Sequence, residues 1–334
     1  MPQKVRGQTA EISYLMLEAN SQCNLRCRTC TRELLARRGL RRPARLDAAT
    51  LRFLLSRLAG LTIDTIKFEG LSEPMLHPDF AELGAILREH YPEAFLIVAT
   101  NGQYRAEKTP LLATIPVIDM LYLSIDGYGR NYELQRRGAL WSRFLRTLAV
   151  LRDRVPPEER RRKLFFNVTV TEHTYRDLPL VYDLQREYGL AGVRINLCQH
   201  WDGDEVNPWS FPSEMLHFLR VYAADVKGVA GWTYRQCFWP FSGLVVDVNG
   251  NVRTCVLDTT APPLGNLFVQ ELPDIFERSG HYLATRRALR RDQPGPRCRT
   301  CDYAGLSGLL SELFGSEGRG NAPRPFLDLG EAGS

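Results

Sequence analysis

The stretch "EISYLMLEANSQCNLRCRTC" (residues 11–30) puts an apolar segment directly before three cysteines. Cys23, Cys27 and Cys30 follow the spacing C-x3-C-x2-C, and no fourth cysteine lies close behind them in the sequence. Iron–sulfur cubanes normally take four thiolates, so three thiolates from one loop leave one iron with an open coordination position. Catalytic zinc sites keep a ligand position open in the same way. The spacing predicts an open iron–sulfur site; the alternatives are a zinc site or loop cysteines without a metal.

Length and composition are ordinary for a folded soluble protein. The 334 residues suffice for about two domains of roughly 150 residues each. The N-terminus lacks an apolar stretch of signal-peptide length, and the longest apolar runs are too short to cross a bilayer. We therefore predict a cytoplasmic protein without a membrane partner. In a reducing compartment, eight cysteines indicate metal or redox chemistry rather than disulfides.

The net charge of +5 is mild, and basic residues gather in two stretches, 32–45 and 154–163. Each stretch is interpreted as a solvated loop or charged helix end, or as a docking surface for an acidic partner or an anionic substrate. Neither stretch interleaves aromatic residues with the positive charge, and the sequence shows no known nucleic-acid-binding module. The sequence therefore predicts no nucleic-acid partner.

Short apolar runs alternate with amphipathic stretches from residue 11 to residue 198. The predicted strands cover residues 11–19, 65–70, 95–102, 120–127, 164–171 and 192–198. The predicted helices include 48–61, 79–91 and 141–154, the first with Asp47 as its N-cap. Apolar strands that alternate with helices are typical of a parallel sheet covered by helices. Six such units predict an α/β fold with a partial (β/α)6 TIM-like barrel over residues 11–205, rather than a full eight-unit barrel.

A different pattern follows the barrel segment. Residues 206–230 are predicted to form a linker helix, residues 231–312 a small α+β domain, and residues 313–334 a tail. Within the small domain, "GLVVDVNGNVRTCV" (243–256) predicts a hairpin that turns at Asn249-Gly250. A helix is expected near residues 271–291, before a closing C-x2-C pair.

The cysteine motif after the first strand of such a barrel resembles the signature of the radical S-adenosylmethionine (SAM) superfamily. In that family the open iron of a [4Fe–4S] cluster binds the amino and carboxylate groups of SAM. An electron from the cluster cleaves SAM to methionine and a 5′-deoxyadenosyl radical, which abstracts a hydrogen atom from the substrate. The resemblance implies SAM as cofactor and an electron donor of the flavodoxin or ferredoxin type.

Further positions resemble SAM-binding motifs of the family, in the same order along the chain. Glu73 in "EGLSEP" (69–74) resembles the carboxylate that holds the SAM amino group, a role that suits an acceptor facing an ammonium. Asn101 ends "FLIVATN", and Ser124 in "LSIDG" (123–127) is similar to a residue that contacts the SAM carboxylate. Arg137 in "ELQRRG" matches an arginine directed at the same carboxylate. These positions fall at or beyond strand C-terminal ends, where barrel enzymes build active sites.

Two positions depart from the family pattern. Thr29 stands where an aromatic residue usually packs near the adenine, and Ser72 replaces the second glycine of the Gly-Gly-Glu motif. The expected contact to the adenine is therefore not carried over to Thr29.

Four further cysteines lie toward the C-terminal end: Cys237, Cys255, Cys298 and Cys301. Their placement around a hairpin and after a helix resembles the "twitch" domain, a shortened SPASM domain with one auxiliary [4Fe–4S] cluster. The resemblance implies that these cysteines bind a second cluster, fully ligated and suited to electron transfer. A four-cysteine zinc ribbon is the alternative.

The remaining cysteine, Cys198, ends the last predicted strand. Strand alternation puts Arg194, Asn196 and Cys198 on one face, so this polar face is expected to point into the barrel cavity. Cys198 would then be able to return a hydrogen atom to a substrate radical. The other interpretation is a small buried cysteine packed as a hydrophobic residue.

The reaction predicted first is inversion of a carbon of a sugar-type substrate, with Cys198 as hydrogen donor. This resembles radical SAM epimerases of antibiotic biosynthesis, which act on aminoglycosides and related oligosaccharides. The alternatives are a dehydrogenase that passes electrons to the auxiliary cluster, a diol dehydratase, a peptide-modifying SPASM enzyme and a zinc-binding module. The peptide-modifying enzyme is less favoured because little chain precedes Cys23 to form a peptide-binding domain. Candidate substrate contacts near strand ends are Glu18, Asn167, Asn196 and His200.

Overall fold

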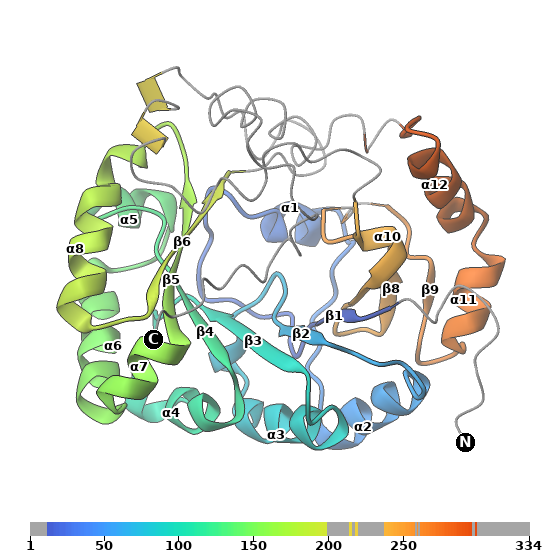
Figure 1. Cartoon of the computed structure of the whole chain (residues 1–334), viewed down its shortest axis with the longest axis horizontal. Helices are drawn as coiled ribbons and strands as arrows, with labels where there is room; N and C mark the ends of the chain where they lie inside the picture. Colours follow the sequence, from blue (N-terminus) through green and yellow to red (C-terminus); the bar gives the residue numbers. More distant parts are fainter. Residues whose placement is uncertain are drawn as a thin grey trace, which may run out of the picture.

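A curved parallel sheet with helices on its outer side forms the main body of the chain (Figure 1). The computed structural model describes residues 12–198, 214–215, 218–219, 237–257, 259, 261–295 and 298. The six parallel strands follow the chain in order around the sheet. They are β1 (Tyr14–Leu17), β2 (Thr65–Phe68), β3 (Phe95–Thr100), β4 (Met120–Ser124), β5 (Leu164–Val170) and β6 (Gly192–Leu197). The predicted partial (β/α)6 barrel is confirmed.

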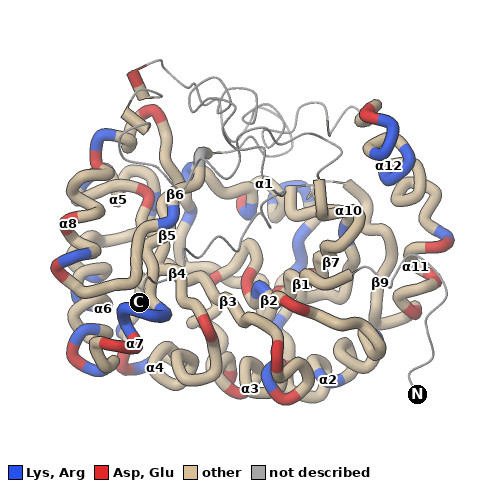
Figure 2. The backbone as a smooth tube through the Cα atoms, in the orientation of Figure 1, with Lys and Arg blue, Asp and Glu red and all other residues tan. Residues whose placement is uncertain are grey.

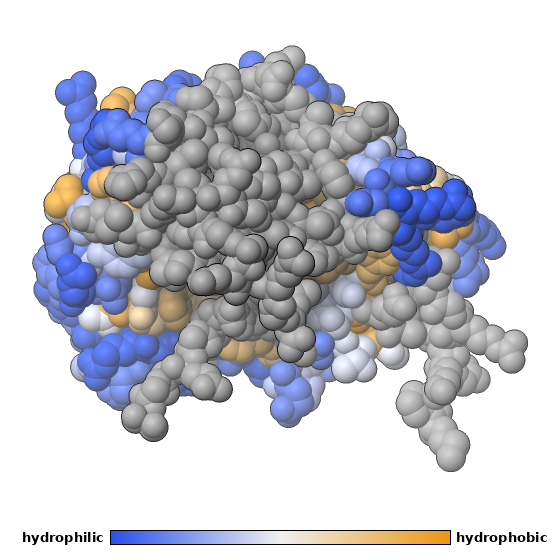
Figure 3. All heavy atoms as spheres, turned by 45° about the horizontal axis from the view of Figure 1, so that its top comes forward, coloured by the Kyte–Doolittle hydropathy of each residue, from blue (hydrophilic) through white to orange (hydrophobic). Residues whose placement is uncertain are grey.

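Most of the helices that connect these strands lie on the outside of the sheet (Figure 1). They are α2 (Ala48–Arg57), α3 (Phe80–His90), α4 (Leu111–Thr114), α5 (Arg130–Gln135), α6 (Trp141–Arg154), α7 (Pro157–Lys163) and α8 (Leu178–Tyr188). The exception is α1 (Arg32–Arg37), whose Leu35 lines the cavity inside the barrel. Asp47 caps α2 as expected, since its Oδ1 accepts a hydrogen bond from Thr50 N (2.7 Å). The outer surface carries many hydrophilic side chains (Figure 3). Among the described residues, no helix combines the length and apolar character needed to span a membrane.

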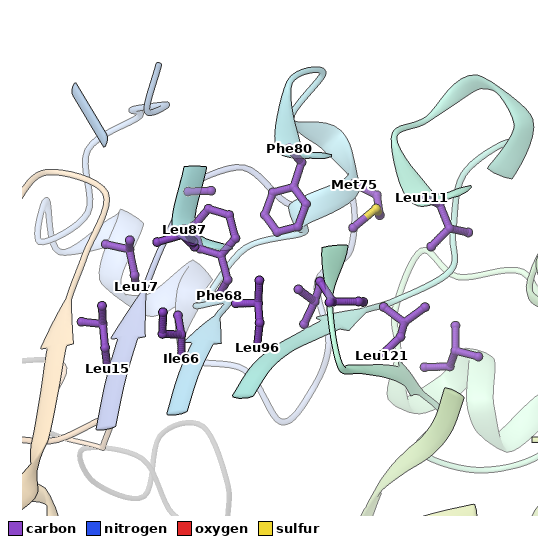
Figure 4. Close-up of a cluster of buried hydrophobic side chains, with 14 of the residues drawn as sticks. Leu15, Leu17, Ile66, Phe68, Met75, Phe80, Leu87, Leu96, Leu111 and Leu121 are labelled. Carbon is purple, nitrogen blue, oxygen red and sulfur yellow. The ribbon is translucent and has the colours of Figure 1, made fainter. Parts of the chain in front are cut away.

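The hydrophobic core lies between the sheet and its helices. Leu15, Ile66 and Leu96 of adjacent strands belong to the same buried cluster as residues of α3 (Figure 4). Phe68 stacks on Phe80 of α3 with ring centroids 4.6 Å apart. Burial in β5 alternates strictly, so every second residue faces this core and the residues between them face the interior of the barrel. The alternation provides an inner surface that polar side chains can occupy.

The C-terminal segment extends the sheet beyond β1. It comprises α10 (Trp239–Ser242), β7 (Gly243–Val246), β8 (Asn251–Arg253), β9 (Gly265–Asn266), α11 (Leu272–Arg278) and α12 (Gly280–Arg290). β7 pairs in parallel with β1, and β8 and β9 follow in antiparallel register. The predicted hairpin is therefore present, and its first strand joins the barrel sheet.

Two details of this segment go beyond the sequence prediction. Asp247 Oδ1 organises the hairpin turn by accepting hydrogen bonds from Asn249 N (2.9 Å) and Asn251 N (3.1 Å). The single helix expected near 271–291 is wrong, because the chain forms α11 and α12 with a break at Ser279. The Ser279 backbone is extended, and its Oγ caps α12 by accepting from Tyr282 N (3.3 Å). Most of the predicted linker 206–230 and the tail 313–334 lie outside the described residues, so the domain boundaries stay predictions.

Candidate active site

The three cysteines of the front motif lie on the loop that follows β1. Cys30 N donates to Cys27 O (3.2 Å), and Leu25 N donates to Cys23 Sγ (3.5 Å), so the loop is tightly turned. Burial raises the pKa of all three thiols, that of Cys27 to about 12, and the Arg136 guanidinium opposes the shift at Cys27. Because iron binds the thiolate, loading the loop must displace protons from these thiols.

The cysteine loop borders a cavity of about 200 Å³ at the C-terminal ends of the strands. This cofactor cavity is lined by the three cysteines together with Glu73, Asn101, Ser124, Asp126 and Arg136. The structure thus brings together the three front cysteines and the predicted Glu73, Asn101 and Ser124. Arg137 does not line this cavity; it lines a neighbouring hollow that borders the same cysteine loop.

Glu73 is a buried carboxylate, with 1% of its surface exposed. Its Oε1 accepts hydrogen bonds from Met75 N (3.0 Å) and Thr100 Oγ1 (2.6 Å), and its Oε2 accepts from Asn101 N (2.7 Å). Burial raises the pKa of Glu73 to about 7, although these hydrogen bonds favour the ionised form. Glu73 therefore fixes the end of β3 and can carry a charge that depends on pH near neutrality.

Asn101 connects β3 to the cysteine loop. Its Nδ2 donates to Asn24 Oδ1 (2.9 Å) and lies 3.8 Å from Cys23 Sγ. Its Oδ1 accepts from Gln103 N (2.7 Å). Since every polar atom of the side chain is engaged within the protein, Asn101 positions the loop that carries the cysteines.

Sequence reasoning missed an ion pair between Asp126 and Arg136. Arg136 Nη1 lies 2.6 Å from Asp126 Oδ2, and Asp126 Oδ1 accepts from Thr169 N (2.9 Å). The Nε of Arg136 is buried and has no hydrogen-bond partner among the described residues. An anionic group bound in the cofactor cavity would satisfy it. The only sequence signal was the first arginine of "QRRG" (135–138), directly before Arg137, the residue that the family pattern selected.

A second and larger cavity, of about 320 Å³, lies inside the barrel. Cys198, Arg194 and Asn196 all line it, and so does Asn167 of β5. Asn196 Nδ2 donates to Asn167 Oδ1 (2.7 Å), and Arg194 Nη1 donates to Tyr122 Oη (3.0 Å). Cys198 is fully buried, and its backbone N donates to Val170 O (3.0 Å). We call this the interior cavity.

Glu18 also lines the interior cavity, but its carboxylate is engaged within the protein. Arg41 binds it through Nη2 (2.6 Å) and Nη1 (3.1 Å), and the same Nη2 donates to Leu71 O (3.0 Å). Burial raises the pKa of Glu18, against the opposing effect of Arg41. A Cβ at Gly70 would lie 2.4 Å from Glu18 Oε1, so a larger residue here would have to displace the Glu18 side chain from its ion pair with Arg41. Glu18 and Arg41 therefore join the segment after α1 to the ends of β1 and β2. His200 lies outside the described residues.

The two cavities adjoin one another. Six residues line both of them: Thr29, Glu69, Gly70, Leu71, Asn167 and Thr169. Glu69 Oε1 lies 2.5 Å from Lys67 Nζ, whereas its Oε2 is buried without a hydrogen-bond partner among the described residues. A molecule in the interior cavity is thus in direct reach of one in the cofactor cavity.

Two of the C-terminal cysteines pack against residues that line the interior cavity. Cys237 and Cys255 both pack against the buried cluster of Tyr14, Trp239 and Val245. Trp239 also lines the interior cavity. Cys298 is partly buried, and Cys301 lies outside the described residues.

Comparison with known families identifies the class of protein. Residues 18–184 match the model of the Radical SAM superfamily, and residues 237–302 match the SPASM iron–sulfur cluster-binding domain. The chain belongs to the radical SAM superfamily, and its cofactors are SAM and iron–sulfur clusters. The geometry fits these groups: one loop supplies three thiols, Glu73 can face an ammonium, and the orphaned Nε of Arg136 can face a carboxylate.

Individual proteins match this chain at low identity or over only part of its length. GTP 3′,8-cyclase of Chlorobaculum tepidum is 32% identical over 120 residues, which are 36% of this chain and 34% of the cyclase. The match therefore spans about a third of that relative's length. Native anSMEcpe with bound AdoMet has a TM-score of 0.64 at 17% identity, covering 90% of this chain and 96% of that one. Streptococcus suis SuiB bound to precursor peptide SuiA has a TM-score of 0.61 at 13% identity, covering 88% and 70%. These structures share the fold of this chain.

Proposed function

We propose that this radical SAM enzyme inverts one carbon of a polar, sugar-type small molecule, with Cys198 as the hydrogen donor. The observation that carries the proposal is the position of Cys198 in the interior cavity, which adjoins the cofactor cavity. When bound, SAM and the cluster supply a carbon radical that abstracts a hydrogen atom from the substrate. A thiol on the other side of the substrate then suits hydrogen return to the opposite face.

In this proposal, the residues of the cofactor cavity hold SAM by charge. The Glu73 carboxylate faces the amino group, and Arg136, held in place by Asp126, faces the carboxylate. Ser124 contacts the same carboxylate from the end of β4, and Asn101 holds the cysteine loop through Asn24. Cys23, Cys27 and Cys30 bind one cluster, and Cys237, Cys255, Cys298 and Cys301 bind the auxiliary cluster.

The lining of the interior cavity supports a polar substrate. Asn167, Asn196 and Arg194 present amide and guanidinium groups beside Cys198. Hydroxyl groups of a sugar can exchange hydrogen bonds with such side chains, whereas an apolar ligand would leave them unsatisfied. A modified peptide is the competing substrate class.

Oxidation of an alcohol is the second candidate reaction. It is favoured by the location of Cys237 and Cys255, which pack against residues that also line the interior cavity. An auxiliary cluster there can accept an electron from a substrate radical, and no thiol donor is then needed.

Turnover in deuterated water separates these reactions. The reconstituted enzyme is incubated with SAM, reductant and a panel of aminoglycosides and oligosaccharides, and the products are examined by mass spectrometry. The epimerase incorporates one solvent deuterium at a carbon, because the thiol hydrogen exchanges with water. A product lighter than the substrate by two hydrogens would instead identify the dehydrogenase, and turnover of peptides alone would overturn the sugar assignment.

A further inference from the structure

The cysteine loop borders a second hollow in addition to the cofactor cavity. Arg26 N donates to Arg137 O and Arg28 N donates to Gln135 O, each at 2.9 Å, so the loop pairs with the segment after α5. The arginine side chains along these paired segments point to different sides. Arg136 turns inward to Asp126, whereas Arg28 and Arg137 are exposed and do not line the cofactor cavity.

These exposed arginines surround a hollow of about 880 Å³. We call it the arginine hollow; its lining includes Arg26, Arg28, Arg37 and Arg137 together with Cys27 and Cys30. Glu33 is the only acidic residue among the described lining residues, and it is already within 2.6 Å of Arg32 Nη2. The hollow is therefore strongly basic, and it adjoins the cofactor cavity, because Arg26, Cys27, Cys30 and Glu33 line both.

Exposed leucines lie next to the arginines in the sequence. Leu134 and Leu140 flank Arg137 in the sequence and are 52% and 46% exposed. Apolar side chains beside clustered charge are typical of the surfaces that bind protein partners. A basic surface also accelerates association with an acidic partner.

We propose that the arginine hollow is the docking surface for an acidic electron-transfer protein that reduces the cluster held by Cys23, Cys27 and Cys30. One electron passes from the reduced carrier, which is oxidised, to this cluster, and no bond is formed or broken in that step. Docking at this surface gives the electron a short path from the carrier to the cluster, because Cys27 and Cys30 line the hollow. The proposal rests on membership of the radical SAM superfamily and is independent of the reaction assigned to Cys198.

Two other basic surfaces provide controls. Arg161 and Arg162 are exposed on α7, which leads into the start of β5 and so lies at the opposite end of the sheet from the cysteine loop. Arg287 and Arg290 are exposed on α12, which Figure 2 shows with a concentration of basic positions. Reversing two charges in each region changes the net charge of the protein equally.

The test measures binding of an acidic flavodoxin to the anaerobically reconstituted enzyme by calorimetry. We expect Arg28→Glu/Arg37→Glu to weaken the affinity by about tenfold or more at low salt, with a smaller difference at high salt. Arg161→Glu/Arg162→Glu and Arg287→Glu/Arg290→Glu should bind as the wild type does. Equal weakening in all three variants, or weakening only in the α12 variant, would overturn the proposal.

A second readout separates docking from cofactor binding. Deoxyadenosine formation driven by dithionite, a small reductant that needs no docking surface, should be unchanged in Arg28→Glu/Arg37→Glu, whereas formation driven by reduced flavodoxin should fall. Loss of both activities would show that the variant damages the cofactor site, and would also overturn the proposal. Neither outcome depends on the identity of the substrate.

Discussion

The cofactor cavity and the interior cavity adjoin but are built differently. Around the cofactor cavity, Glu73, Asn101 and Asp126 are engaged with backbone or side-chain groups of neighbouring strands, so the site is rigid before any ligand binds. The interior cavity is lined by side chains from both ends of the chain, including β1, β6 and the C-terminal hairpin. The first cavity is therefore suited to an invariant cofactor, and the second can differ in shape and polarity with the substrate.

The largest effect is expected at the cysteine loop. Cys27→Ala removes one of three ligands and should abolish cleavage of SAM. Cys255→Ala alters the auxiliary site and should retain the cleavage of SAM that occurs in the absence of substrate. Iron analysis after anaerobic reconstitution measures the same contrast, since two cubanes hold about eight irons and each variant should lose about four. Abundant SAM cleavage by Cys27→Ala would contradict the assignment of this loop.

Two adjacent arginines give the next test, because one faces inward and the other outward. Arg136→Gln leaves the buried carboxylate of Asp126 without its partner and should reduce the free energy of unfolding by about 3 kcal/mol. It should also weaken SAM binding. Arg137→Gln removes an exposed side chain and should leave both quantities close to the wild type. The two variants are compared by thermal unfolding and by equilibrium SAM binding. A larger loss of SAM affinity in Arg137→Gln would instead support contact of Arg137 with the SAM carboxylate, as the family pattern suggests.

A smaller effect is expected from pH, at the carboxylate of the cofactor cavity. Burial raises the pKa of Glu73 to about 7, so below pH 7 the side chain is mainly protonated and lacks the charge that faces an ammonium. SAM affinity should therefore rise with pH up to about 7, by at most tenfold per unit, and level off above it. The contribution of Glu73 to folding has the opposite sign: because its pKa is raised, stability falls as pH rises from about 4.5 toward 7. Glu73→Gln should bind SAM weakly with no such pH dependence. If the variant showed the wild-type dependence of SAM affinity on pH, Glu73 would be excluded as the group that binds the SAM amino group.

Much of the barrel could be predicted from the sequence because its information is local. Each strand is a short apolar run, and Asp47 stands directly before the helix that it caps. The cysteine spacing and the Glu73 motif are also contiguous, so they can be recognised without knowledge of the fold. The alternation that puts Cys198 on the face of Arg194 and Asn196 is likewise readable from one strand.

The features that were missed depend on contacts between distant segments. Arg136 rather than Arg137 turns inward because residues 135–137 pair with residues 26–28, more than a hundred positions earlier. The addition of β7 to the edge of β1 joins segments that are still farther apart. Neither contact leaves a periodic pattern in the sequence. The break between α11 and α12 is a local feature, but a single serine cap within a helical pattern is a weak signal.

The fate of the substrate radical when Cys198 is removed tests the central claim most directly. With a substrate identified from the panel, wild type and Cys198→Ala are compared for deoxyadenosine and for product. We expect the variant to form deoxyadenosine in the presence of substrate but no inverted product, because abstraction proceeds and hydrogen return fails. An inverted product formed by Cys198→Ala at the wild-type rate would contradict the assignment of Cys198 as the hydrogen donor.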